Sequence, residues 1–117
     1  MNRENIIQSK SFEFSLNIIK LYKNLTKAKE FVISKQLLRS GTSIGANIEE
    51  ALAGFSKKDF LYKMSLSSKE ARETRYWLRL LKQSELTQIN VESYLHDVNQ
   101  IINILTSIVK TTQENNS

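Results

Sequence analysis

Basic side chains are concentrated in one part of this chain. Between residues 57 and 82, eight Lys and Arg residues stand against three acids, and the resulting local charge of +5 equals the net charge of the whole chain. If this window is helical, one face carries six basic residues and no acid: Lys57, Lys58, Arg72, Arg75, Arg79 and Lys82. The planar guanidinium fork of Arg matches phosphate oxygens, so this face is a candidate surface for RNA or DNA.

Two other interpretations of the basic face stay open. A solvated helix face often carries a run of charge, and an acidic protein partner would suit the same surface. The sequence has no helix-turn-helix pattern, RNA-recognition aromatics or zinc finger, so binding should depend on backbone and shape more than on base sequence. Tyr76 lies beside the basic residues and could either stack on a base or lie at the edge of the core.

Small and polar residues form a second group, near the predicted helix contacts: Ser40, Ser43, Asn47, Glu50 and Glu73. They could line a catalytic pocket, or form a hydrogen-bond network that fixes helix register or subunit pairing. We favour the network, because buried polar groups must be paired and the sequence shows no activated Ser, paired general acid and base, or phosphate loop. The sequence therefore predicts a protein that is not an enzyme and has no cofactor.

Metal binding has little support. The chain has no Cys, and its single His, His96, lies on the polar face of the last helix with Glu92 one turn before it. A di-metal site in a helix bundle needs two Glu-x-x-His pairs, which a chain with one His cannot supply. We expect no metal site.

Four amphipathic segments must position these residues. Apolar spacing predicts helices at about 3–25, 29–53, 57–82 and 91–111, in a single domain covering 1–117. Four such helices with short turns and no strand signal predict an all-α, antiparallel up-down-up-down four-helix bundle. No membrane span or signal-peptide core is visible, so we expect a soluble, cytoplasmic protein without a membrane partner.

Local signals place the helix ends. Three polar residues are predicted N-caps: Thr26, Ser56 and Asn90. Asp59 would complete a capping box with Ser56, and the spacing of Phe55 and Phe60 is that of a hydrophobic staple. Gly54 suits a left-handed position just past a helix end. In the second helix, Gly41 and Gly45 lie on or beside the apolar stripe, which predicts that another backbone comes close.

The first and third helices carry more apolar surface than one stripe needs. The additional residues are Phe12, Leu16 and Ile19, and then Leu66, Trp77 and Leu80. Leaving them in water would forgo roughly 1.5–3 kcal/mol for each large side chain. We therefore expect a homo-oligomer, the alternative being one unusually wide core into which both stripes point.

Three segments carry a resemblance to a known family: 41–51 (GTSIGANIEEA), 56–60 (SKKDF) and 69–78 (KEARETRYWL). In this order they resemble the bacterial four-helix bundle protein family, also called the 23S rRNA intervening-sequence protein family. The likeness covers nearly the whole chain. Many relatives have Pro where this chain has Gly45 and Gly where it has Ala51, so these two positions do not assign the chain to one subgroup of the family.

The resemblance implies an up-down-up-down bundle that assembles as a ring-like pentamer. Some members are encoded within insertions in large-subunit ribosomal RNA genes. A related accessory protein of diversity-generating retroelements works with a reverse transcriptase and binds nucleic acid through a basic surface. No enzymatic activity is established for the family. The partners to expect by resemblance are therefore further copies of the chain, RNA or DNA, and a reverse transcriptase or RNA-processing protein.

Overall fold

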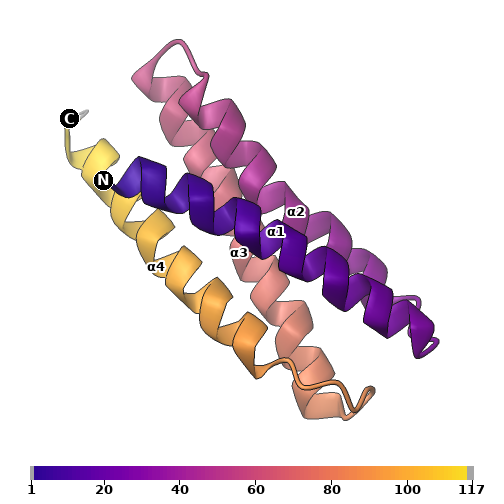
Figure 1. The fold of residues 1–117 in the computed structure, drawn as a ribbon. Coiled ribbons are helices and arrows are strands. Elements are labelled where there is room, and N and C mark those ends of the chain that lie inside the picture. The colour runs from indigo at the N-terminus through magenta and orange to yellow at the C-terminus, as the bar shows by residue number, and fades with distance from the viewer. Residues whose placement is uncertain (1, 116–117) are drawn as a thin grey trace.

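The computed structural model describes residues 2–115, and this part of the chain folds into four α-helices without a strand. The helices are α1 (Arg3–Lys27), α2 (Ile33–Leu52), α3 (Lys57–Ser84) and α4 (Glu92–Asn115). Consecutive helices run antiparallel, and α4 returns to pack on α1, so the start of α1 and the end of α4 lie at the same end of the bundle (Figure 1). The bundle measures 47 × 24 × 22 Å. The predicted all-α fold of four helices is confirmed.

Each helix packs mainly on two neighbours, since in the described residues no Cα atom of α1 lies within 8 Å of one in α3, and the same holds for α2 and α4. The core forms where the four apolar stripes converge, and its largest fully buried side chains include Phe14, Ile18, Leu37, Ile44, Met64, Leu78 and Ile101. Spacings of three and four residues place such side chains on one side of each helix, which is why the core spacing could be read from the sequence. None of the helices within residues 2–115 is both long and apolar enough to span a membrane.

The glycines of α2 face α1, although the close neighbour at Gly41 is a side chain and not the backbone that the sequence predicted. A Cβ built on Gly41 would lie 2.9 Å from Cγ2 of Ile18, nearer than real Cβ contacts come. One turn on, Gly45 faces Ser11, whose carbonyl oxygen would be 3.5 Å from such an atom. The small-residue run therefore stays helical because it packs against α1.

The start of α2 differs from the prediction. The helix begins at Ile33, not near residue 29, and Thr26 does not cap it, because its hydroxyl donates to the carbonyl oxygen of Tyr22 inside α1. The carboxylate of Glu30 instead accepts hydrogen bonds from the backbone N–H groups of Val32, Ile33 and Ser34. Lys29 takes a left-handed conformation (φ 68°) at the turn. The side chain of Glu30, three residues before α2, thus accepts from the N–H groups at the start of the helix, a role that the sequence pattern assigned to the Thr26 hydroxyl.

The turn between α2 and α3 confirms the predicted cap and contradicts three other predictions, one of which is the capping box, because no hydrogen bond from the Ser56 N–H to the Asp59 carboxylate forms in the described residues. Ser56 caps α3, its hydroxyl oxygen accepting from the N–H of Asp59 at 3.1 Å. The predicted staple is wrong, because Phe55 is fully exposed while Phe60 packs on the core. Gly54 does not take the left-handed conformation either. Glycine suits this position because a larger residue would be crowded: a Cβ there would lie 3.1 Å from the carbonyl oxygen of Ala51.

The remaining boundaries, at the end of α3 and at both ends of α4, follow ordinary signals. Asn90 behaves as the predicted cap of α4, its side-chain oxygen accepting from the N–H of Glu92 at 2.9 Å. α3 runs two residues beyond the predicted end, and Glu85 closes it in a left-handed conformation (φ 57°). α4 continues to Asn115, past the predicted end at 111, since no glycine or proline interrupts it.

Candidate functional site

Three arginines of α3 lie along its seam with α4. Nη2 of Arg72 donates to Oγ1 of Thr106 at 3.2 Å, and Nη1 of Arg75 donates to Oδ1 of Asn99 at 3.2 Å. Arg79 is exposed and makes no hydrogen bond or ion pair within residues 2–115. Both acceptors are neutral, so they orient the guanidinium groups without cancelling their charge. We call Arg72, Arg75 and Arg79 the arginine strip.

Lys82 does not extend the arginine strip as an unpaired charge. Its Nζ lies 2.5 Å from Oε1 of Glu92, the first residue of α4. The sequence face carried no acid, but folding brings one to it from the neighbouring helix. Among the predicted basic residues at this seam, Arg72, Arg75 and Arg79 are therefore the ones without an acidic partner in the described chain.

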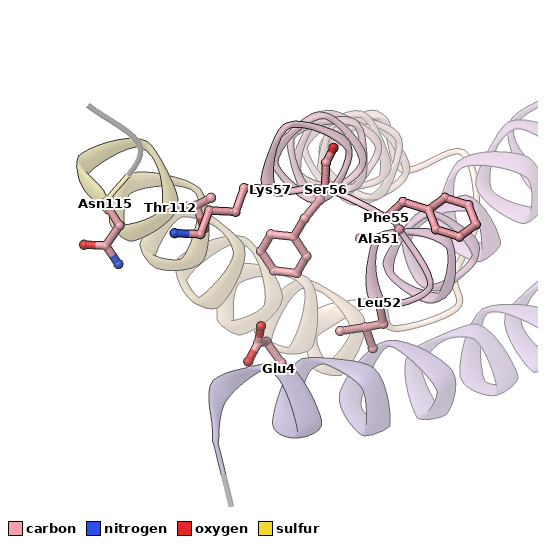
Figure 2. A pocket seen from close by; sticks show the side chains of 10 residues that line it. Glu4, Ala51, Leu52, Phe55, Ser56, Lys57, Thr112 and Asn115 are labelled. Atoms are coloured by element: carbon pink, nitrogen blue, oxygen red, sulfur yellow. The ribbon is translucent and has the colours of Figure 1, made fainter.

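Lys57 and Lys58 lie at the other end of α3. Fifteen residues separate Lys57 from Arg72, or about 22 Å along a helix. Lys57 lines a cavity of about 420 Å³ at the end of the bundle, together with Glu4 of α1 and Thr112 of α4 (Figure 2). Figure 2 also shows Phe55 pointing away from these side chains. The six predicted basic residues therefore do not form one continuous patch.

At the seam between α2 and α3, by contrast, the basic side chains are paired with acidic ones. Arg39 pairs with both Glu70 and Glu73, and Nζ of Lys63 lies 2.7 Å from Oε1 of Glu50. The hydrogen bond from Lys63 to the Glu50 carboxylate raises the pKa of Lys63 above its ordinary value. Cations on this side are thus matched by acids, whereas the arginine strip on the α4 side is not.

The predicted polar group lies along the same α2–α3 seam and mostly makes structural contacts. Oγ1 of the buried Thr74 is hydrogen-bonded to Oγ of Ser40 at 2.9 Å and lies 2.8 Å from the carbonyl oxygen of Glu70, and Glu73 accepts from Nε1 of Trp77 at 3.0 Å. Ser43 and Asn47 bond within α2, to the carbonyl oxygens of Arg39 and Ser43 respectively. With Glu50 paired to Lys63, all five predicted residues have protein partners.

The additional apolar residues divide between exposed and partly buried positions. Phe12 and Leu16 on α1 are 61% and 41% exposed. Ile19, Leu66 and Leu80 are half-buried, and Trp77 packs against the edge of the core. Tyr62 and Tyr76 add exposed rings on α3, and the Tyr76 ring meets Trp77 edge-on at 5.1 Å. A single chain therefore leaves apolar surface on both α1 and α3 in contact with solvent.

Sequence reasoning missed a hollow between α3 and α4. Its volume is about 260 Å³, and its polar lining includes Ser65, Ser68, Arg72, Thr106 and Lys110. The spacing of α4 places Lys110 only on the polar face of that helix. Because the pairing of α3 with α4 is what brings it near Arg72, no pattern within either helix carries that information.

Metal-ligating side chains do not converge in the part of the chain that the structure describes. No group of three or more His, Asp or Glu residues there could hold an ion. The ring of His96 contacts the side-chain amide of Gln100 at 3.2 Å.

Comparisons with known proteins agree on one relationship. The family model described as "23S rRNA-intervening sequence protein" matches residues 3–107. A crystal structure from Bacteroides thetaiotaomicron, titled as a protein with unknown function from the S23 ribosomal protein family, superposes with a TM-score of 0.88. It is 49% identical, and the match covers 93% of this chain and 99% of that one. Among curated proteins, no significant match was found.

Proposed function

The chain belongs to the 23S rRNA-intervening sequence protein family, and we propose that it is a self-associating, non-catalytic bundle that binds the RNA or DNA backbone through the arginine strip. The observation that carries this proposal is the uncompensated charge of Arg72, Arg75 and Arg79. The first two are held by neutral acceptors and the third makes no hydrogen bond or ion pair within residues 2–115. The α2–α3 seam, by contrast, pairs Arg39 and Lys63 with acids.

Backbone binding follows from the kind of groups present. Guanidinium forks on one helix bind phosphate oxygens but carry no pattern that distinguishes bases. Each phosphate that they neutralise releases counterions, which makes affinity fall as salt rises. Tyr76, half-exposed on the neighbouring face, is a stacking platform that would tolerate any base.

Self-association would explain the exposed apolar surface. Phe12 and Leu16 lie on α1 and Tyr62 and Tyr76 on α3, and these two helices lie on a diagonal of the bundle. Two different patches on opposed helices favour head-to-tail contacts, which form a ring when the rotation between successive copies closes. A ring of five copies, as the family resemblance implies, would gather five arginine strips in one assembly and strengthen the field acting on a polyanion.

Binding to a short single-stranded RNA over a series of salt concentrations tests the proposal. The double variant Arg75→Gln/Arg79→Gln should bind at least about tenfold more weakly and lower the salt slope by about 0.7 for each phosphate that is no longer neutralised. The control Lys20→Gln/Lys35→Gln removes the same charge from exposed positions of α1 and α2. An equal loss of affinity in the control, or no salt dependence in the wild type, would rule out the arginine strip as the binding surface.

Two further measurements complete the test. Binding to an acidic polypeptide but not to RNA would favour the protein-partner interpretation of the same surface. Light scattering at micromolar concentration should show an oligomer that Phe12→Ser/Leu16→Ser reduces to monomers. A wild-type monomer would mean that self-association is not the reason why these apolar residues are exposed.

A further inference from the structure

We propose that the hollow between α3 and α4 is a binding site for a single phosphate group. This deepens the proposed function and rests on it in one respect, since the nucleic-acid backbone is one of two possible sources of that phosphate. The hollow has a volume of about 260 Å³. One water takes up about 30 Å³, so a phosphate and several waters can fit there together.

Two cations reach the hollow from different helices. Arg72 comes from α3 and Lys110 from α4, and none of the described residues that line it is acidic. Arg72 is held in place by its hydrogen bond to Thr106, which leaves four of its five N–H groups for other acceptors. Lys110 lies one turn beyond Thr106, is exposed, and makes no ion pair within residues 2–115. An anion in this position would be attracted from two sides.

The serine hydroxyls supply a second, independent observation. Ser65 and Ser68 line the hollow and are half-buried, yet neither hydroxyl makes a hydrogen bond in the described part of the chain. Helical serines commonly donate to a carbonyl one turn back, as the hydroxyl of Ser43 does in α2. Two half-buried donors without protein partners, beside two cations, suit a ligand with several acceptor oxygens. A phosphate presents such oxygens in a compact tetrahedron.

The source of the phosphate is either the backbone of a bound nucleic acid or a free phosphate compound. Arg75 and Arg79 continue from Arg72 along the same seam, away from the hollow. A nucleic-acid strand lying on the arginine strip would therefore reach the hollow at its Arg72 end. A free phosphate compound would need the hollow alone. The two sources predict different results for variants that alter only the hollow.

The test measures thermal stability with inorganic phosphate against chloride at equal ionic strength, and RNA affinity in parallel. Phosphate should raise the wild-type midpoint by about 5 °C at ten times its dissociation constant. Ser68→Ala changes no charge, favours the helix and should abolish most of that rise, as should Lys110→Gln. The control Lys35→Gln removes one exposed charge from α2, the helix diagonally opposite α4, and should keep the rise.

RNA affinity then separates the sources. A loss of about three- to tenfold in Ser68→Ala, with an unchanged salt slope, supports a backbone phosphate in the hollow. Unchanged RNA affinity with an abolished phosphate effect keeps the site but overturns its assignment to nucleic acid, leaving a free phosphate compound as the ligand. If phosphate gives no stabilisation and both hollow variants behave like Lys35→Gln, the site is refuted.

This proposal can fail separately from the proposed function. Should Arg75→Gln/Arg79→Gln still weaken RNA binding while the hollow variants do nothing, the arginine strip survives and the phosphate site does not. Should that double variant bind RNA normally while Ser68 and Lys110 control phosphate stabilisation, the phosphate site survives and the backbone-binding proposal falls.

Discussion

Gly41 of α2 lies against Ile18 of α1 so closely that a Cβ on the glycine would be 2.9 Å from Cγ2 and 3.0 Å from Cγ1 of the isoleucine. Both residues are fully enclosed, and β-branched Ile18 has little rotamer freedom with which to move away. In Gly41→Ala, a gain of about 1 kcal/mol in helix propensity opposes an overpacking cost of about 1–3 kcal/mol. We expect net destabilisation, measured by urea unfolding.

Gly45 provides the matched control one turn along the same helix. A Cβ there would lie 3.4 Å from Oγ of Ser11 and 3.5 Å from its carbonyl oxygen, which is ordinary contact. Gly45→Ala should therefore gain most of the helix-propensity term, up to about 1 kcal/mol. If both variants shift stability in the same direction by the same amount, close packing does not distinguish these two glycines.

The buried hydrogen bond between Thr74 and Ser40 should contribute to stability through the α2–α3 seam. Both side chains are fully buried, and their hydroxyl oxygens are 2.9 Å apart. Thr74→Val keeps the shape but removes the hydroxyl, which leaves the buried Ser40 hydroxyl without this partner and also ends the contact with the carbonyl oxygen of Glu70 one turn back. We expect a loss of about 1–3 kcal/mol. Thr42→Val is the control, since that hydroxyl bonds only within α2. In the double variant Ser40→Ala/Thr74→Val the losses should be less than additive, and strict additivity would contradict a direct coupling.

The fold was predictable where a repeating pattern determined it. Steps of three and four residues placed Met64, Ala71 and Leu78 on the buried face of α3, and the structure has them fully enclosed. The start of α2 was not predictable in this way, because its donors are satisfied by the long side chain of Glu30 rather than by a short cap. Capping rules describe Ser, Thr, Asp and Asn next to the helix well. They describe poorly a glutamate that caps the helix from three residues away.

The candidate site shows the same division. The charge imbalance of α3 was visible in the sequence, because it needs only one helix. Whether each cation is compensated depends on the neighbouring helix, and there Lys82 gains Glu92 while Arg72 gains only Thr106. Lys110 joins the hollow for the same reason. Such contacts between helices have no signal within a single amphipathic pattern.

The turn before α3 allows the cap and the staple to be separated. Ser56 accepts a hydrogen bond from the N–H of Asp59, whereas Phe55 is fully exposed. Ser56→Ala should lower the free energy of unfolding by about 1 kcal/mol. Phe55→Ser should change it by no more than about 0.5 kcal/mol, as surface substitutions usually do. Denaturant titration of both variants decides this, and a larger loss from Phe55→Ser would mean that the ring packs on Phe60 after all.

Alkaline pH should destabilise the bundle through two groups. Burial raises the pKa of Tyr94 above its ordinary value of 10.0, and the Glu50 carboxylate raises the pKa of Lys63 above 10.5. When the pKa of a side chain is higher in the folded state, that side chain keeps its proton to a higher pH in the folded chain than in the unfolded chain. The stabilising contribution is therefore complete below the ordinary value and is lost as pH rises through the folded-state pKa.

Substitutions can assign this alkaline loss to its sources. Tyr94→Phe removes one source, so unfolding free energies measured at about pH 9 and about pH 11 should differ less than in the wild type. Glu50→Gln removes the carboxylate that favours the charged Lys63, and it should lower stability at about pH 9 while also reducing the alkaline fall. The exposed Tyr62 gives the control Tyr62→Phe. If that variant flattens the alkaline fall as much as Tyr94→Phe, burial of the Tyr94 ring is not its cause.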